Sequence, residues 1–568
     1  MLCLGAFAVA AAAFRLRATD VFWHLAAGRW ILEHRRLPDS DPFRFTSDEI
    51  QWVDHEWLFQ VLIRLVEIVG GVVGLQVLRQ ALVLLLAGVL FVGVRRIGAS
   101  IPSTVAIVLL TLLGARPRFL LRPEILTFIA LGLLLIGLRH IARRPSQRTA
   151  MMLVGLVVVW VNLHGEAILA PVISGLYLLG ERQQPRLDVD PASERKPLSW
   201  AWVLGLPVAI TAALLINPYG PHILSVGRGI TGALSGLSAY NPEWLPLWLA
   251  PQPFLLMGFV GAATLGGFAW KKTGWFHRPT LLVTAGLAVV AASAVRHQAL
   301  FFVAAAFFFA ETWGVLRRHR ALPELDPKRS TAFVSWLCIA AMIWCLTPPS
   351  SGPVRPRQGR FTPGLGIEPG RFPEKAADFL ERHHEIGPLF SSFAYGGYLL
   401  WRLYPPRRVF HDGRMELQPD LLKEIGDARS DNPSWDALLD RYGAVGALVR
   451  IDNRPRPIAR FDKATETMEV EGYSTSNALL FPPATYALVY WDDLVMLFLD
   501  RSESHPDDLL AQEYRYVQPE DVTSTLLRSA ADPAYRAGAL NEVRRKLEED
   551  PQSLLARALL ELLSEMSS

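Results

Sequence analysis

Long runs of apolar residues follow one another along the first 347 residues and then end. About 20 apolar residues in a helix cross the ~30 Å hydrocarbon core of a bilayer. Eleven runs approach this length, although several are shorter. They cover residues 1–14, 72–94, 101–114, 123–138, 151–163, 167–180, 199–216, 251–269, 279–295, 299–315 and 331–347. The pattern predicts a polytopic α-helical membrane protein with a transmembrane domain over residues 1–347.

The rest of the chain has the shorter patterns of a water-soluble domain. Residues 348–370 are rich in Pro, Gly and Arg and are typical of a linker. Strand and helix patterns alternate over residues 371–500 and predict an α/β or α+β domain. Within it, Tyr395-Gly396-Gly397-Tyr398 predicts a turn. Residues 501–568 carry Leu and Ala at helical spacing and predict a C-terminal helical segment.

The soluble domain has a more detailed expected layout. Strands are expected from 388, over 447–449, and as a hairpin of 487–490 with 495–499, and helices over 373–384 and 433–442. We expect this domain to bind a partner or to shape a substrate site.

Composition adds three exclusions. The 57 Lys and Arg residues barely exceed the 53 Asp and Glu residues, so the net charge of +4 does not indicate a nucleic-acid partner. Cys3, Cys338 and Cys345 all lie in apolar runs, and they indicate neither a disulfide framework nor a zinc site. The uneven spread of apolar residues excludes a purely soluble enzyme. A preference for Arg over Lys, with much Ala, Leu and Gly, favours a bacterial protein of the inner (plasma) membrane.

Basic residues occur in every second loop between the apolar runs, which the positive-inside rule places in the cytoplasm. They are Arg95, Arg96, Arg139, Arg143, Arg144, Arg148, Lys271, Lys272, Arg278, Arg317, Arg318, Arg320, Lys328 and Arg329. The rule predicts a cytoplasmic N-terminus and an extracytoplasmic domain after residue 347.

The same orientation gathers unusual ionisable residues on the extracytoplasmic side. They are Asp20, His24, Asp54, His55, Glu56, Arg118, Arg122, His164, Glu166, Glu243, Arg296 and His297. Ionisable groups at a membrane edge are costly unless they pair or function. We therefore predict an active or binding face on this side.

The first outer loop, residues 15–56, holds the candidate catalytic residues. Asp20 and His24 are four residues apart and share a face of an expected interfacial helix. Asp20 is a candidate general base or metal ligand, which His24, His55 and Glu56 would complete. The alternative is structural: Asp54 caps a helix, Glu56 lies in its first turn, and the histidines lie at the interface.

The remaining candidates also have two interpretations. Arg118 and Arg122 either bind a lipid phosphate or extend to headgroups. Candidates for substrate binding are also found at His164 with Glu166 and at Arg296 with His297, where helix-end hydrogen bonding is the alternative. Asp412-Gly413-Arg414, an accessory candidate, either contacts a sugar or phosphate or forms a structural salt bridge. No HExxH, CxxC, GxSxG or Gly-rich phosphate motif is present. Whether the protein binds a divalent metal is left open by the sequence, and Asp20 and His55 are the possible ligands.

The architecture, with Thr19-Asp20 at the exit of the first apolar run, resembles C-type glycosyltransferases (the GT-C fold), which include protein mannosyltransferases and lipid A aminoarabinose transferases. Family members often carry an Asp-Glu pair, whereas Val21 follows Asp20 here. The resemblance implies sugar transfer from a polyprenyl-phosphate donor to an acceptor on the extracytoplasmic face, with catalysis by Asp20. The implied partners are membrane lipids, the lipid-linked sugar and an unidentified acceptor.

The sequence also resembles uncharacterised bacterial multi-span proteins. Asp20-x-x-Trp23-His24-Leu25-x-x-Gly28, Asp54-His55-Glu56-Trp57-Leu58, Gly396-Gly397-Tyr398 and Asp412-Gly413-Arg414 carry this resemblance. A non-catalytic envelope assembly or scaffold protein is therefore the alternative function. A transporter is less favoured, because the charges lie at the ends of the apolar runs and no internal repeat is found.

Overall fold

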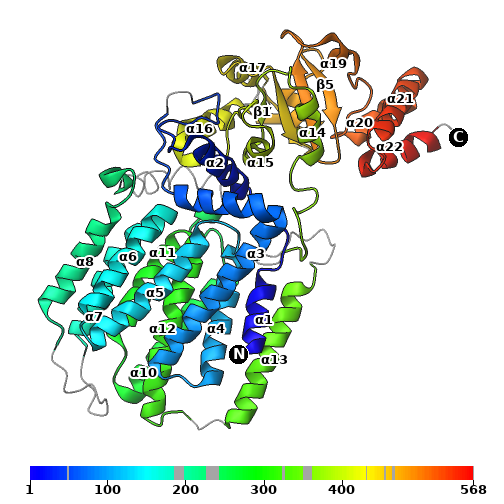
Figure 1. Ribbon diagram of the computed structural model, residues 1–568. Helices are drawn as coiled ribbons and strands as arrows, with labels where there is room; N and C mark the ends of the chain where they lie inside the picture. Colours follow the sequence, from blue (N-terminus) through cyan, green and yellow to red (C-terminus); the bar gives the residue numbers. More distant parts are fainter. Residues whose placement is uncertain are drawn as a thin grey trace. The chain divides into compact units, whose positions relative to one another are not determined.

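The computed structural model describes residues 1–47, 50–184, 197–224, 242–322, 326–348, 361–429, 432–452, 456–462 and 467–566. The chain forms two compact units (Figure 1). The helical unit comprises residues 1–18, 27–37 and 53–368. The sheet unit comprises residues 19–26, 38–52 and 369–568.

Each of the eleven predicted apolar segments coincides with a helix. These helices are α1 (Leu2–Ala11), α3 (Trp57–Ile97), α4 (Ile101–Ala115), α5 (Glu124–Arg143), α6 (Gln147–Leu163), α7 (Leu169–Arg182), α8 (Trp200–Leu214), α10 (Pro253–Thr273), α11 (Arg278–Ser293), α12 (Gln298–Arg318) and α13 (Pro327–Leu346). Within the described residues, five stretches are long and apolar enough to cross a membrane: α3, α5, α10, α13 and Val295–Arg318, which contains α12. The remaining helices are shorter than such a span requires.

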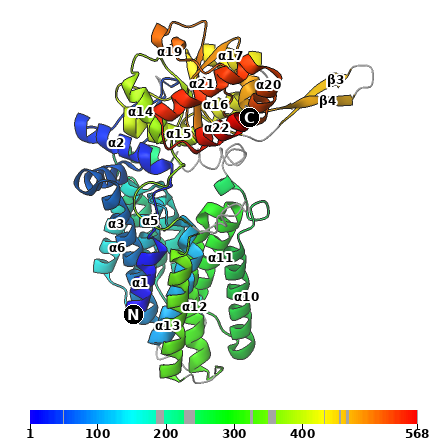
Figure 2. The same ribbon diagram turned by 90° about the vertical axis from the view of Figure 1, so that its right-hand side faces the viewer.

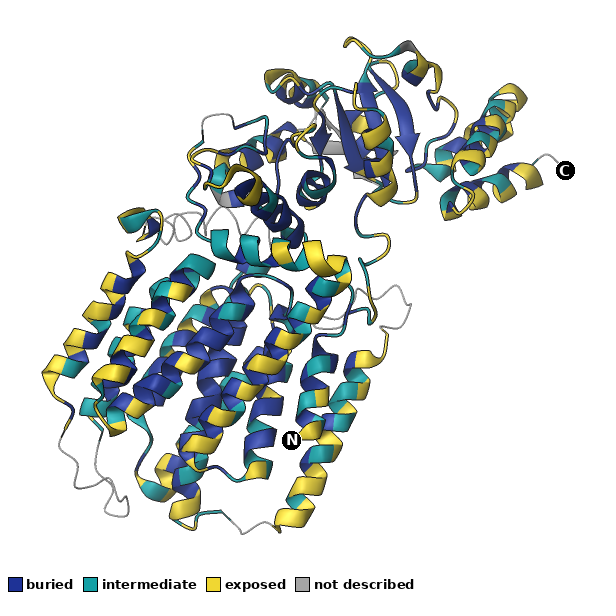
Figure 3. Cartoon of the chain, in the orientation of Figure 1, coloured by how far each residue is buried: buried dark blue, intermediate teal, exposed yellow. Residues whose placement is uncertain are grey.

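Burial separates inner from outer helices in the helical unit. In its most apolar window, 83% of the residues of Val295–Arg318 are buried, against 11% for α10 and 17% for α13. Helix α13 is exposed along much of its length (Figure 3). Phe333 and Trp336 are among its exposed large apolar side chains. Apolar surface of this extent is costly in water, so the pattern suggests a membrane location.

Helix α2 (Asp20–His34) lies in the segment where the sequence predicted a helix. Helix α3 follows and is interrupted at Gly71, whose φ of 55° and ψ of −152° are not helical. Its N-cap residue is Glu56, not Asp54, so the capping interpretation of Asp54 is wrong. The Asp54 carboxylate instead accepts a hydrogen bond from the Gln60 amide, at 2.6 Å.

The sheet unit is built on a mixed four-stranded sheet of order β1-β2-β6-β5. Its strands are β1 (Phe390–Ser391), β2 (Gly446–Arg450), β5 (Tyr486–Trp491) and β6 (Val495–Asp500). β1 pairs with β2 in parallel, whereas β2–β6 and β5–β6 are antiparallel, with Leu448 opposite Leu497. The antiparallel pairs and the flanking helices make this an α+β arrangement.

Helices accompany the sheet throughout the unit. They are α14 (Glu374–Arg382), α15 (Phe393–Leu403), α16 (Pro419–Ala428), α17 (Asn432–Arg441), α18 (Ser476–Leu480), α19 (Asp507–Ala511), α20 (Val522–Ala531), α21 (Pro533–Glu549) and α22 (Leu554–Glu565). A separate pair, β3 (Arg456–Asp462) with β4 (Thr467–Ser474), extends away from the rest of the unit (Figure 2).

The predicted turn at Tyr395–Tyr398 is wrong, because these residues lie inside α15. The two glycines serve close approach. A Cβ atom on Gly396 would lie 2.0 Å from the His411 carbonyl oxygen, and one on Gly397 would lie 2.9 Å from the Thr19 carbonyl oxygen. The helix therefore packs directly against backbone, which only glycine permits.

Candidate functional site

Polar residues from four separate chain segments meet in the helical unit. His55 and Glu56 precede α3, and Arg118 and Arg122 lie between α4 and α5. His164 and Glu166 lie at the short η2 turn (Gly165–Ile168), and Arg296 and His297 lie in η5 (Val295–His297). The structure thus brings together the predicted candidates of this unit, and it places them at helix ends and in short connecting turns.

Three arginines and two glutamates form one part of this site, the arginine–glutamate cluster of Arg118, Arg122, Glu124, Glu243 and Arg296. The Arg118 guanidinium donates to Glu124, with Nε 3.1 Å from Oε2, and its Nη1 lies 2.9 Å from the Glu243 carboxylate. Arg122 also donates to Glu243, at 2.8 Å, and Arg296 donates to Glu124, at 2.6 Å. The formal charge of the cluster is +1.

The charges of this cluster are fixed by their neighbours. Burial disfavours the charged form of Arg118. The attraction to Glu124 and Glu243 outweighs this effect of burial and raises the pKa of the guanidinium. Burial likewise opposes ionisation of Glu243, yet Arg118 and Arg122 lower the pKa of this carboxyl to about 2. Arg118 and Glu243 are therefore both charged at neutral pH.

The second part is the histidine–glutamate cluster of His55, Glu56, His164, Glu166 and His297. Nδ1 of His297 lies 3.0 Å from Glu166, and Nδ1 of His164 lies 3.6 Å from the same carboxylate. On the other side, Nε2 of His164 lies 3.6 Å and Nε2 of His55 lies 3.7 Å from Glu56. Two carboxylates therefore alternate with three imidazoles.

Two imidazoles of this cluster, those of His55 and His164, have a lowered pKa. Burial, together with the nearby His164, lowers the pKa of His55 to about 4. Burial also lowers the pKa of His164, whose Nδ1 lies 2.8 Å from the Thr127 hydroxyl. Both rings are neutral at neutral pH, so each offers one hydrogen-bond donor and one acceptor.

The two clusters are neighbours. Arg296 and His297 are consecutive, and they bind Glu124 of one cluster and Glu166 of the other. Thr127 lies one turn after Glu124 on α5 and contacts His164. An anion bound by the arginines would therefore lie beside imidazoles and carboxylates.

Asp20 and His24 belong to the sheet unit, where both lie on α2. The Thr19 hydroxyl donates to the Asp20 carboxylate, at 3.2 Å. Gly413 lies against this carboxylate, because a Cβ atom added there would be 2.9 Å from Asp20 Oδ1. His24 is buried, and its ring lies 3.6 Å from that of Trp23. Two motifs far apart in sequence thus meet at Asp20 and Gly413.

Asp412 and Arg414 lie in a buried ion-pair network of the sheet unit. Arg414 contacts both Asp412 and Asp41, with its Nη1 2.9 Å from Asp41, and Arg44 donates to Asp41 at 2.6 Å. The Arg414 guanidinium also lies 4.5 Å from the centre of the Trp52 ring. This geometry favours the structural salt bridge over contact with a sugar or phosphate.

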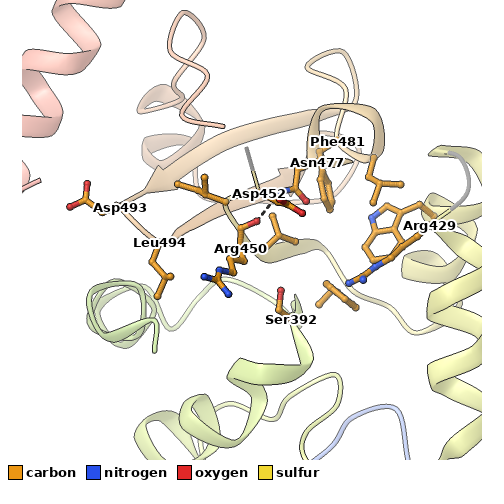
Figure 4. Close-up of a pocket in the computed structure, with 13 residues that line it drawn as sticks. Ser392, Arg429, Arg450, Asp452, Asn477, Phe481, Asp493 and Leu494 are labelled. Atoms are coloured by element: carbon orange, nitrogen blue, oxygen red, sulfur yellow. Dashed lines mark hydrogen bonds between the residues drawn. The ribbon is translucent and has the colours of Figure 1, made fainter. Parts of the chain in front are cut away.

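A pocket of about 650 Å³ opens at the sheet of the same unit (Figure 4). Ser392 directly follows β1, and Asp452 lies two residues after β2, so the pocket is at the carboxyl ends of the parallel pair. Ligands bind in this position in many α/β sheets. The Asn477 amide donates to the Arg450 carbonyl, at 2.9 Å, and Phe481 adds an aromatic wall.

Glu124 and Asp41 are the partners that sequence reasoning did not select. Glu124 opens the apolar run at 123–138 directly after Pro123, and a carboxylate beside several arginines was the available signal. Asp41 precedes Pro42 in the first outer loop, and the sequence offers no signal for its partner. No group of three or more His, Cys, Asp or Glu residues with the geometry of a metal site is found in the described part of the chain. The two possible metal ligands, Asp20 and His55, belong to different units.

Comparison with known proteins identifies a similar fold. The chain resembles the crystal structure of the apo form of the Archaeoglobus fulgidus oligosaccharyltransferase, with 11% sequence identity and a TM-score of 0.54. The match covers 97% of this chain and 86% of that chain. No protein-family model matches the sequence, and no curated protein does. The similarity of fold is consistent with the GT-C fold that the sequence resembles.

Proposed function

We propose that this protein is an integral membrane glycosyltransferase that moves a sugar from a polyprenyl-phosphate donor to an acceptor on the extracytoplasmic face. The observation that carries the proposal is the arginine–glutamate cluster beside the histidine–glutamate cluster in the helical unit. The fold similarity to an oligosaccharyltransferase supports the same class of reaction. The proposed location is the bacterial inner membrane.

The arginines are proposed to bind the donor phosphate. Glu243 is the most exposed member of their cluster, with 31% of its side chain accessible, whereas Arg118 and Glu124 are buried. Phosphate oxygens accept bidentate hydrogen bonds from guanidinium groups, as carboxylates do. We expect the donor phosphate to replace Glu243 on Arg118 and Arg122, while Glu124 keeps the arginines in place.

The reaction would be an inverting displacement. The acceptor nucleophile attacks the anomeric carbon, the new bond forms, and the bond from this carbon to the phosphate oxygen breaks. The electron pair leaves with the lipid phosphate, whose growing charge Arg118, Arg122 and Arg296 neutralise. The proton of the nucleophile passes to a general base, and Asp20, His24 and Glu56 are the candidates for this role.

The histidine–glutamate cluster is proposed to bind the sugar or the acceptor. His164, Glu166 and His297 supply both donors and acceptors, which hydroxyl groups require. A divalent metal remains part of the hypothesis. Removal of metal by a chelator from membranes containing the protein would measure this dependence directly.

Donor consumption in membranes tests the proposal. With a radiolabelled polyprenyl-phosphate sugar, Arg296→Gln should lower turnover by about 100-fold, the cost of removing one donor to a developing negative charge. Arg317→Gln is the matched control, because Arg317 is exposed at the other end of α12 and should leave turnover unchanged. Asp20→Asn should abolish turnover, and wild-type activity in this variant would remove Asp20 from the mechanism.

The alternative is a non-catalytic scaffold of envelope assembly, and the pocket of the sheet unit favours it. This pocket combines Arg429, Arg450 and Asp452 with aromatic walls, a surface suited to a peptide or saccharide partner. A complex that is stable and functional in an Asp20→Asn, Arg296→Gln double variant would support this function. No consumption of any donor by the wild-type protein would support it as well.

A further inference from the structure

A second polar site lies in the helical unit, at the other end of helix α5. Glu124 begins this helix and Arg143 ends it. Twenty residues at 1.5 Å each place the two ends roughly 30 Å apart. At the Arg143 end, a groove of about 890 Å³ runs between the ends of α3 and α5 and the beginning of α6.

The groove is strongly basic. Among the residues that line it, none is acidic. Its cationic or titratable lining residues are Arg96, Arg139, His140, Arg143, Arg144 and Arg148. Such a concentration of arginine without a matching carboxylate in the lining favours an anionic ligand.

Arg139 provides a buried hydrogen-bond donor at this groove. Its side chain is buried, with 8% of the residue exposed, and its Nε donates to Glu311 at 2.7 Å. Its Nη1 donates to the Arg96 carbonyl at 3.3 Å. The third nitrogen, Nη2, is buried and has no hydrogen-bond partner among the described residues. A buried unpaired donor is costly, and an acceptor bound in the groove would satisfy it.

The walls of the groove are held in place by close helix packing. A Cβ atom on Gly137 of α5 would lie 2.5 Å from the side chain of Leu153 on α6. One on Gly93 of α3 would lie 3.1 Å from the side chain of Ile136. Small residues at helix crossings allow such contact. The groove is therefore a feature of the packed helices.

The apolar part of the lining selects among anions. Leu133 is 39% exposed and Met152 is 57% exposed, and both line the groove beside the arginines. A free phosphate has no apolar part that could pack against these side chains, whereas the acyl chains of a phospholipid would cover them. Basic pockets between membrane helices bind anionic headgroups for this reason.

We propose that this groove binds the phosphate group of an anionic phospholipid, with Arg139 contacting the phosphate and the surrounding arginines holding the headgroup. The site is separate from the proposed donor site, since it lies at the opposite end of α5. Its role is independent of whether the protein transfers a sugar.

Native mass spectrometry of the purified full-length protein in detergent tests the proposal. Phosphatidylglycerol should bind, and phosphatidylcholine should bind much more weakly. Arg144→Gln with Arg148→Gln should weaken phosphatidylglycerol binding by about tenfold, because each arginine near an anionic headgroup contributes a favourable free energy. Both side chains are exposed, so the double variant should fold normally.

Lys271→Gln with Lys272→Gln is the matched control. These two cations end α10 and do not line the groove, but their removal changes the net charge equally. An equal loss of phosphatidylglycerol binding in this control would overturn the proposal. So would equal binding of phosphatidylcholine by the wild-type protein. Displacement of the lipid by inorganic phosphate at the same concentration would assign the groove to free phosphate instead.

Discussion

Buried arginines occur in several networks of this protein, and their partners decide what each can bind. Arg414 is enclosed by Asp41 and Asp412, two buried carboxylates. Arg118 shares Glu243 with Arg122, and this glutamate is partly exposed and replaceable. Arg139 keeps one buried donor open. The first network is therefore structural, whereas the other two arginines can receive an external anion.

Removal of Arg414 tests the structural interpretation. Arg414→Gln would leave Asp41 and Asp412 buried without this guanidinium, and loss of one partner of a buried ion pair costs roughly 3–5 kcal/mol. We expect a lower free energy of unfolding and a lower midpoint of thermal unfolding, measured by circular dichroism on the purified protein.

Arg441→Gln is the control for this prediction. Arg441 pairs with Glu424 at 3.3 Å, but both side chains are exposed, so the expected loss is below about 1 kcal/mol. If Arg414→Gln unfolds like the wild type yet loses turnover, Arg414 contacts substrate and the structural interpretation is wrong.

The sequence singled out ionisable residues that lie together in the helical unit, but not all of their partners. His164, Glu166, Arg296 and His297 stood out because charge interrupts apolar runs. Glu124 did not, because its pairing with Arg296 depends on the tertiary fold, although Arg118 lies close to it in sequence. Asp41 was not singled out either, because the sequence does not show that Arg414 lies beside it. Pairings between distant segments are set by packing, which a single sequence does not encode locally.

At the level of elements, the glycine pair of α15 was the clearest error. Consecutive glycines usually indicate a turn, and the sequence was interpreted that way. In the structure, Gly396 brings the helix against the backbone at His411, and Gly397 brings it against Thr19. Long apolar runs, in contrast, located the helices of the helical unit, because a helix that is apolar along its length leaves a continuous local signal.

Gly396→Ala tests whether this close approach matters. The added methyl group would lie 2.0 Å from the His411 carbonyl oxygen, so α15 must move away from the loop that carries Asp412 and Gly413. Overpacking of this kind typically costs about 1–3 kcal/mol. We expect the free energy of unfolding to fall by that amount in denaturant titrations monitored by fluorescence.

Gly155→Ala is the matched helical control. Among the described residues, nothing lies within 4 Å of a Cβ atom added to Gly155 on α6. Alanine favours a helix over glycine by about 1 kcal/mol, so this variant should be neutral or more stable. Equal destabilisation by the two changes would show that the contact with His411 does not contribute to the free energy of unfolding.

At the scale of the whole molecule, the chain divides differently from the simple order of domains expected from the sequence. Residues 19–26 and 38–52 of the first outer loop belong to the sheet unit, although more than 300 residues separate them from the rest of it. In the sequence the apolar runs end near residue 347 and the expected linker ends at residue 370, whereas the helical unit extends to residue 368. Composition did not assign the loop, since the loop's partners lie far along the chain.

The expected orientation of the protein in the membrane rests on the distribution of its charges, and it determines which ligands each site could bind. The positive-inside rule places Lys272 in the cytoplasm and Ser502 outside. Both residues are exposed, so single cysteines there can be labelled in a chain whose Cys3, Cys338 and Cys345 are replaced by serine. A membrane-impermeant maleimide should label Ser502→Cys in intact cells, and Lys272→Cys only after permeabilisation. The opposite result would place the sheet unit in the cytoplasm, where an extracytoplasmic acceptor could not reach Asp20, and sugar transfer on the outer face would have to be abandoned.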